Sequence, residues 1–127
     1  MKMVIKALIA STLLCSAASS SAGAIDDYKF FGSMAALSEM CLKSTKISDR
    51  INKVVPAAVK KNPEITDMMN SLIEAYNEAY KKAILDGQIW EATSDGNFRF
   101  SNTINCRNAE QAEKIKFLHD YILKNLK

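Results

Sequence analysis

The sequence predicts an all-α fold, a small bundle of four to five helices with one disulfide and a short aromatic hairpin or loop at about residues 88–104. Three observations predict it. Apolar residues recur at steps of three and four along most of the chain, the period of an amphipathic helix. One segment breaks that period with aromatic residues around an Asp-Gly turn. Two cysteines remain once the N-terminal segment is set aside, enough for one bridge.

The N-terminus predicts a cleaved secretory signal over residues 1–24. Two lysines are followed by an apolar run and by small residues that end in Ala22-Gly23-Ala24, an order typical of export signals. The apolar run is shorter than the ~20 residues that span a bilayer, so we expect no membrane anchor after cleavage. The mature protein is then predicted to be a single helical domain, residues 25–127, in the periplasm or secreted.

Cleavage also changes the charge. It takes away two of the 17 basic residues and none of the 14 acidic ones, so the formal net charge falls from +3 to +1. A nucleic-acid groove needs a broad basic stripe, and the pairs Lys60-Lys61 and Lys81-Lys82 do not supply one. We therefore predict no nucleic-acid partner.

Cysteine content predicts one structural disulfide. Cys15 leaves with the signal, and Cys41 and Cys106 remain. Two such thiols pair in the oxidising compartments that exported proteins enter. A redox-active pair would prefer C-x-x-C spacing, which the sequence lacks. The bridge would tie the first helix of the mature chain to the start of the last.

The first helix of the mature chain is predicted to begin at Asp26-Asp27, whose side chains can cap it. Ser48 is the predicted N-cap of the second helix. Pro56 lies within the apolar pattern of that helix, where a proline removes a hydrogen bond and clashes with the preceding turn. We therefore expect a kink or a break at Pro56.

The third helix, residues 63–86, has the clearest boundaries. Asn62-Pro63-Glu64 combines a capping side chain, a proline at the first helical position and an acid in the first turn. Gly87 follows as a stop signal. At a rise of 1.5 Å per residue this helix would be about 36 Å long.

The last helix is predicted to follow Cys106, where Asn108 and Gln111 form a capping-box pattern. His119, the only histidine, lies on this helix. Ser/His/Asp or Cys/His catalysis would both need this one residue, and no nucleophile lies at a recognisable spacing from it. We interpret His119 as structural, name no catalytic residue and predict that the protein is not an enzyme.

Metal and cofactor motifs are also missing. The sequence has no H-E-x-x-H, no second cysteine pair in the mature chain, no histidine cluster and no glycine-rich phosphate loop. Met68-Met69 lies at a helical apolar stripe, where methionine fills core gaps. We predict no metal and no cofactor.

Residues 88–104 carry the feature most suggestive of function. An Asp-Gly turn between two aromatic-containing runs favours a hairpin, but two strands alone are marginally stable, so an irregular loop stays open. Trp and Arg are enriched at binding hot spots. We predict a partner-binding site made of Trp90, Asp95, Phe98, Arg99 and Phe100. In the alternative interpretation, these aromatic residues cap the open end of the bundle.

The overall plan resembles the periplasmic immunity proteins that protect against type VI secretion amidases, in Ala36-Leu37-Ser38-Glu39-Met40-Cys41 and in the segment Phe100 to Cys106. It is also similar to the spackle type of phage-encoded lysozyme inhibitor, in Glu39-Met40-Cys41 and Lys60-Lys61-Asn62-Pro63-Glu64. The resemblance implies a protein that binds a wall-cutting enzyme and blocks its cleft. It transfers no individual functional residue.

The leading hypothesis is therefore a periplasmic inhibitor or immunity protein whose partner is another protein, a peptidoglycan hydrolase. A periplasmic stress chaperone that opens at low pH is one alternative. An accessory component of an envelope secretion or conjugation system is another. The sequence is also compatible with a homodimer.

Overall fold

A computed structural model describes residues 17–92, 95–102 and 105–126. Within them lie four α-helices and one hairpin: α2 (Ala17–Leu37), α3 (Lys46–Lys61), α4 (Thr66–Asp86), β1 (Gln88–Ala92), β2 (Phe98–Asn102) and α5 (Ala109–Asn125). A π-helical turn, η1 (Ser38–Leu42), extends α2, and a 3-10 turn, η2 (Pro63–Ile65), precedes α4. This confirms the predicted small helical fold with one disulfide, and it resolves the aromatic segment as a hairpin.

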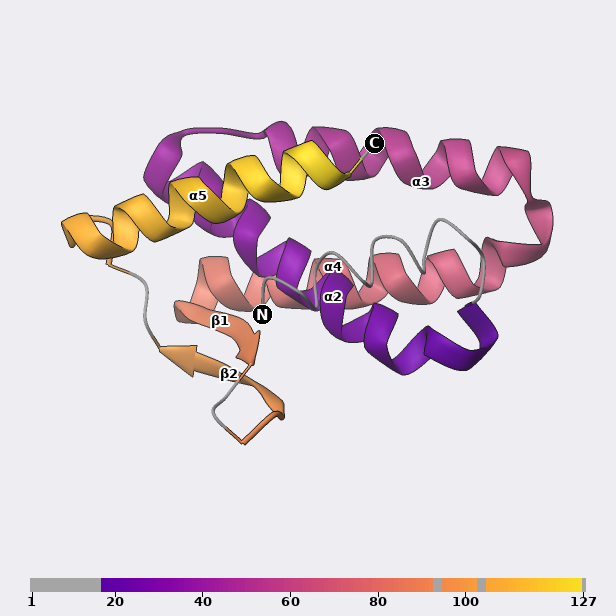
Figure 1. The fold of residues 1–127 in the computed structure, drawn as a ribbon, viewed down its shortest axis with the longest axis horizontal. Helices are drawn as coiled ribbons and strands as arrows, with labels where there is room; N and C mark the ends of the chain where they lie inside the picture. Colours follow the sequence, from indigo (N-terminus) through magenta and orange to yellow (C-terminus); the bar gives the residue numbers. More distant parts are fainter. Residues whose placement is uncertain (1–16, 93–94, 103–104, 127) are drawn as a thin grey trace.

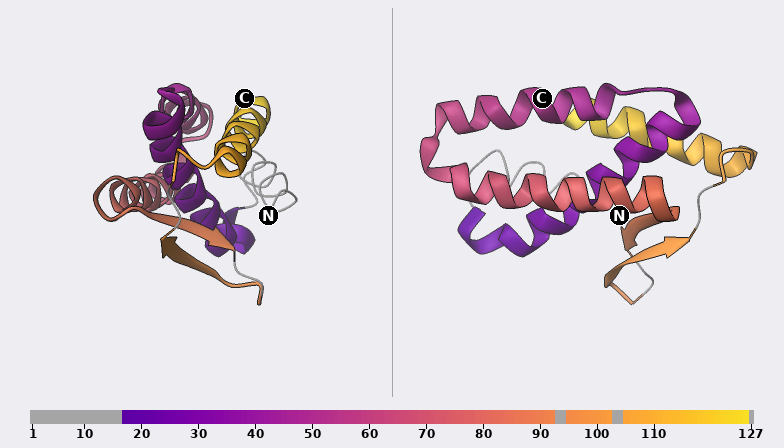
Figure 2. Two further views of the ribbon diagram at one scale, coloured as in Figure 1. Left: turned by 90° about the vertical axis from the view of Figure 1, so that its left-hand side faces the viewer. Right: turned by 180° about the vertical axis from the view of Figure 1, so that it is seen from behind.

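The helices are arranged around α2. Figure 1 shows α3 and α5 in an upper layer and α4 in a lower layer, with α2 crossing from one to the other. Seen end on (Figure 2, left), α2 lies between the other three helices, and it packs most extensively against α4. The hairpin lies at the opposite end of α4 from the α3–α4 turn (Figure 1). The C-terminal end of α2, the hairpin and the start of α5 meet at one end of the molecule (Figure 1).

The core takes side chains from all four helices. Its most deeply buried large apolar members are 0–2% exposed: Tyr28, Phe30, Phe31, Met34, Leu37, Ile47, Ile51, Met69, Leu72 and Ile122. Each such side chain contributes about 1.5–3 kcal/mol on burial. They recur at the helical spacing that predicted the fold, so burial of these stripes is what holds the helices together.

Gly32 sets the close approach of α2 to α4. A Cβ added at this position would lie 2.1 Å from the carbonyl oxygen of Tyr76, and that oxygen is backbone that cannot rotate away. The glycine costs a little helix propensity, but it lets the two longest helices touch.

We expect Gly32→Ala to lower the free energy of unfolding by about 3 kcal/mol, because the helices must separate to admit the methyl group. Urea unfolding followed by circular dichroism measures the loss. Gly96→Ala is the matched control. It has a positive φ of +87°, but an added Cβ would have nothing within 4 Å among the described residues, so it should cost only about 1 kcal/mol. Equal losses in the two variants would contradict the steric explanation.

The start of α2 differs from the prediction. In the uncut chain α2 begins at Ala17 and continues through Ala24 and Ile25, so Asp26-Asp27 lies inside the helix and does not cap it. The upstream residues are mostly alanine and serine, and alanine has the highest helix propensity. Residues 1–16 of the predicted signal lie outside the described residues, and cleavage after Ala24 stays a prediction.

The second helix also begins earlier than predicted. Its N-cap is Thr45, not Ser48, and α3 continues past Pro56 without a break. The Ser48 hydroxyl is hydrogen-bonded to the phenol of Tyr76 at 2.8 Å, a contact between α3 and α4 that competes with capping. Pro56 is exposed. Ile51 before it is fully buried and Val59 after it packs partly buried against the core, so core packing maintains α3 on both sides of the proline.

The remaining helix ends lie where the sequence signals place them, although the Asn62 side chain makes no capping hydrogen bond at the start of η2. Pro63 opens η2, and Gly87 ends α4 with a left-handed φ of 68°. The Asn108 side chain caps α5 by accepting a hydrogen bond from the backbone N–H of Gln111 at 3.0 Å. The Gln111 side chain accepts from the backbone N–H of Asn105 at 3.1 Å, so it ties the preceding turn to the helix.

Candidate functional sites

The disulfide determines which segments meet at the first candidate site. Cys41 and Cys106 are bonded as predicted, with their Cα atoms 5.1 Å apart although 65 positions separate them in sequence. The bond joins η1 to the residues just before α5. It therefore holds α5 against the connection between η1 and α3.

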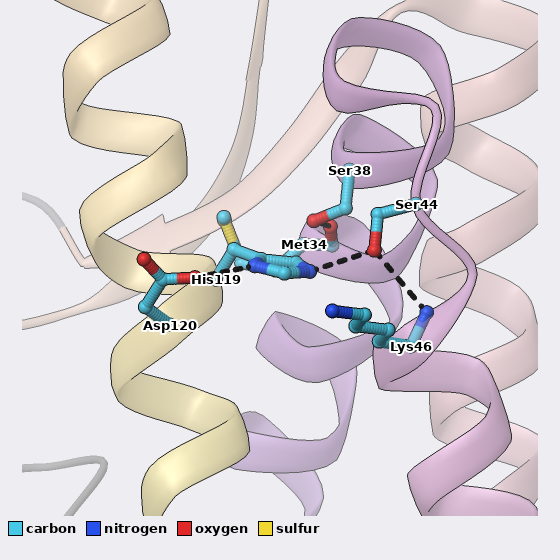
Figure 3. Close-up of polar contacts among 6 residues, drawn as sticks. All are labelled: Met34, Ser38, Ser44, Lys46, His119 and Asp120. Atoms are coloured by element: carbon cyan, nitrogen blue, oxygen red, sulfur yellow. Dashed lines mark hydrogen bonds and ion pairs between the residues drawn. The ribbon is translucent and has the colours of Figure 1, made fainter.

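A polar cluster of Ser44, His119 and Asp120 lies at that junction (Figure 3). The Ser44 hydroxyl lies 2.8 Å from Nε2 of His119, and Nδ1 of His119 lies 2.9 Å from a carboxylate oxygen of Asp120. His119 is only 6% exposed. No sequence spacing indicated this contact, because Ser44 and His119 are 75 positions apart in the chain.

The backbone fixes Ser44 in place. Lys43 has a left-handed φ of 56°, which turns the chain sharply after η1. The N–H of Ser44 then donates to the carbonyl of Ser38 at 3.1 Å. The hydroxyl of Ser44 accepts a hydrogen bond from the N–H of Lys46 at 3.3 Å (Figure 3). Its own proton is consequently free to point toward His119.

Hydrogen-bond chemistry assigns the proton on a neutral His119. An ionised carboxylate only accepts hydrogen bonds, so the bond to Asp120 requires the proton on Nδ1. Nε2 then has a lone pair and accepts from the hydroxyl of Ser44. A serine, a base facing it and a carboxylate that orients the base form the arrangement that activates a nucleophile.

This cluster borders an open cavity of about 580 Å³. Its lining comes from two segments: Leu42, Lys43, Ser44, Thr45, Lys46, Lys116, His119 and Asp120. The three lysines are exposed and outnumber the one acid, so the opening is positively charged at neutral pH. The cavity is therefore suited to an anionic group.

The hairpin forms the second candidate site. Trp90 is paired with Phe100 across the two strands, and their ring centroids lie 4.7 Å apart in an edge-to-face arrangement. Phe98 stacks on Trp90 at 6.1 Å. The Lys29 ammonium lies 4.4 Å from the centre of the Trp90 ring, and the Lys82 ammonium lies 5.3 Å from that of Phe100. One face of the hairpin thus combines three half-buried aromatic rings with two cations.

The other predicted partner-binding residues lie elsewhere on the hairpin. Arg99 is paired with Glu91 on the opposite face and is exposed. Asp95 is in the turn, where its side chain accepts from the N–H of Asn97 at 3.1 Å. Ile89, which is 7% exposed, anchors the hairpin in the core. The structure therefore brings Trp90, Phe98 and Phe100 together and separates Arg99 and Asp95 from them.

Helix α2 braces the hairpin. The backbone N–H of Trp90 donates to the hydroxyl of Ser33 at 2.9 Å. The Trp90 indole N–H is buried and has no hydrogen-bond partner among the described residues. A second cavity of about 170 Å³ lies between α2, β1 and α5, with Phe30, Met34, Ile115 and Leu118 among its apolar lining. It is smaller than the roughly 300–1,000 Å³ of typical ligand pockets.

No group of three metal-ligating side chains occurs among the described residues. None of the described helices combines the length and the apolar character that a membrane crossing requires. The fold and its two clusters define a small, disulfide-linked helical protein with an aromatic hairpin. No family model matches the chain, and neither the curated proteins nor the solved structures give a significant match.

Proposed function

We propose that this chain is an exported protein-binding module, a periplasmic inhibitor or immunity protein that blocks a cell-wall hydrolase. The aromatic face of the hairpin is the observation that carries the proposal. Trp90, Phe98 and Phe100 pack on one another, yet each keeps part of its surface accessible. Clustered aromatic rings on a protein surface are typical of binding hot spots.

The cavity on the other face of β1, the face of Ile89 and Glu91, is too small to favour a small-molecule ligand at the hairpin. A space of about 170 Å³ accommodates one apolar side chain, not a drug-sized ligand. The hairpin sits on the end of the helical body, and its contact with Ser33 holds it in position. A rigid element that presents aromatic rings loses little entropy when it binds, which favours affinity.

The charge of the same face favours an acidic cleft in the partner. Lys29 and Lys82 lie over the aromatic rings, so two cations are presented with the apolar surface. Enzymes that cleave glycans typically carry two carboxyl groups in the active-site cleft. Cations opposite those groups provide the charge complementarity that guides association. The predicted secretory signal would place both proteins in the same compartment.

Inhibition of wall hydrolysis tests this proposal. The purified protein is titrated into a glycan-cleaving and an amide-cleaving wall hydrolase, and clearing of a peptidoglycan suspension is recorded. We expect one of the two enzymes to be inhibited. Trp90→Ala should raise the inhibition constant about thirtyfold, a hot-spot loss of about 2 kcal/mol.

Phe117→Ala is the control, because Phe117 is a 52% exposed aromatic residue that belongs to α5 and not to the hairpin. It should leave inhibition within about twofold of the unchanged protein. Equal effects of the two variants would contradict a role for the hairpin. If neither enzyme is inhibited and export of the protein gives no protection to cells expressing them, the proposed function is wrong.

A further inference from the structure

We propose that Ser44 is an activated nucleophile and that the Ser44–His119–Asp120 cluster is an acyl-transfer site for anionic esters. The inference is independent of the proposed inhibitor function, because it concerns a different surface. It rests on three observations: the two hydrogen bonds of His119, the burial of its ring and the open cavity at the Ser44 hydroxyl.

The first observation is geometric. The distance of 2.8 Å between Ser44 Oγ and His119 Nε2 is within the range required for direct proton transfer. The distance of 2.9 Å from His119 Nδ1 to Asp120 fixes the ring orientation and would stabilise the imidazolium that forms. Asp120 would act as a positioning residue, because it contacts His119 and not the hydroxyl that reacts.

The second observation is the difference in burial along the cluster. His119 is 6% exposed, so little water competes for its nitrogens. Ser44 is half-buried and lines the open cavity, so a substrate can reach its oxygen. The Asp120 side chain is 64% exposed. Solvent screens its charge, and its contribution to the rate should therefore be smaller than that of His119.

The third observation indicates the substrate class. Lys43, Lys46 and Lys116 line the cavity beside Ser44. They would attract a carboxylate or phosphate on the substrate, and their positive field would also stabilise the oxyanion formed at the reacting carbonyl. The site is therefore expected to prefer an acyl ester that carries a negative charge over a neutral one.

The reaction balances without a cofactor. The Ser44 oxygen bonds to the acyl carbon, and its proton passes to Nε2 of His119. The bond from the acyl carbon to the alcohol oxygen then breaks, and His119 returns the proton to the departing alcohol. Water repeats the sequence on the acyl-serine, which releases a carboxylic acid and restores the hydroxyl.

Labelling with a fluorophosphonate tests Ser44 directly. This reagent bonds its phosphorus to an activated serine and releases fluoride. The disulfide-bonded protein is incubated with it, and the adduct is located by peptide mass spectrometry. We expect one adduct, on Ser44, that Ser44→Ala abolishes and Ser71→Ala retains. Ser71 is a matched control, because it is exposed and its hydroxyl donates to the Asp67 carbonyl within α4.

Three further variants separate activation from structure. His119→Gln keeps a polar group near Ser44 but removes the base, and it should slow labelling about a hundredfold. Asp120→Asn should slow labelling about tenfold, and Asp120→Glu should restore part of the rate. Circular dichroism identifies variants that fail to fold. If the unsubstituted protein forms no adduct on Ser44, the proposal is wrong regardless of the results for the variants.

Hydrolysis of two p-nitrophenyl esters tests the substrate class. The succinate monoester carries a free carboxylate and the acetate is neutral. The succinate should be cleaved about tenfold faster at low ionic strength, and added salt should reduce that preference. Equal rates for both esters would overturn the anionic class. Since Trp90→Ala leaves this cluster intact, loss of inhibition with retained labelling would separate this inference from the proposed function.

Discussion

Replacing both bridging cysteines, Cys41→Ser with Cys106→Ser, will lower the free energy of unfolding by about 4 kcal/mol. The bridge spans 65 positions, and a crosslink of that span removes a large share of the entropy of the unfolded chain. Native proteins are typically stable by about 5–15 kcal/mol, so the expected loss is a large fraction of the total stability. Urea unfolding followed by circular dichroism measures it.

A reducing agent provides the control for that experiment. Reduction should destabilise the unchanged protein by a similar amount and should leave the double variant unaffected, because the variant has no bridge to break. A loss below about 1 kcal/mol would show that packing of α5 holds the junction without the disulfide. A response of the double variant to reduction would point to an effect unrelated to Cys41 and Cys106.

Asp27 should make the uncut chain less stable as the pH rises. Its side chain is buried, and its Oδ2 has no hydrogen-bond partner among the described residues. Burial, with a smaller contribution from the Asp26 charge, raises the pKa of Asp27 from 3.8 to about 9. Between these values the folded state keeps a proton that the unfolded state releases. Stability contributed by the neutral carboxyl is thus present below about pH 4 and is lost as the pH rises toward 9.

Asp27→Asn removes this titration while it keeps the shape of the side chain. We expect the variant to be more stable than the unchanged protein at pH 7 and equal to it near pH 3. Between about pH 4 and 9 the difference should grow by about 1.4 kcal/mol per pH unit. Urea midpoints collected from pH 3 to 9 measure the slope. Parallel profiles for the two proteins would show that Asp27 is ionised in the folded state.

Cleavage before Ile25 should reduce the same slope. In a chain that begins there, Asp27 lies in the first turn of α2, close to the new terminal ammonium. Both that charge and the positive end of the helix dipole favour an ionised carboxylate. The shortened chain should therefore depend less on pH than the full chain, which links the predicted processing to a stability measurement.

Local signals in the sequence predicted most of the helix ends. The proline at position 63, the glycine at 87 and the cap at Asn108 each act through the residues next to them. The starts of α2 and α3 were predicted wrongly, because Asp27 is buried inside a helix that begins upstream and Ser48 binds Tyr76 on another helix. The early start of α2 follows from the alanine-rich residues that the prediction assigned to the signal, whereas the contact of Ser48 with Tyr76 leaves no local trace in the sequence.

The two candidate sites also differ in how well the sequence predicted them. The hairpin could be predicted from the sequence because its aromatic residues are close together in the chain around a turn. The contact between Ser44 and His119 joins positions 75 apart, and no periodic pattern relates a serine after a π-helical turn to a histidine on the last helix. The His119-Asp120 dipeptide was its only local sign. Ser44 meets His119 at the junction where the disulfide joins η1 to the residues before α5, and the sequence does not show that junction.

The disulfide also gives the molecule an unusual covalent outline. The backbone from Cys41 to Cys106 and the bridge between them form a closed loop that contains α3, α4 and the hairpin, while α2 and α5 extend from it as two tails. A protease that cuts once at the hairpin turn would therefore release no fragment. On a denaturing gel the nicked protein should migrate as one band without reductant and as two bands with it. An enzyme that clipped the hairpin would therefore leave the clipped protein covalently in one piece.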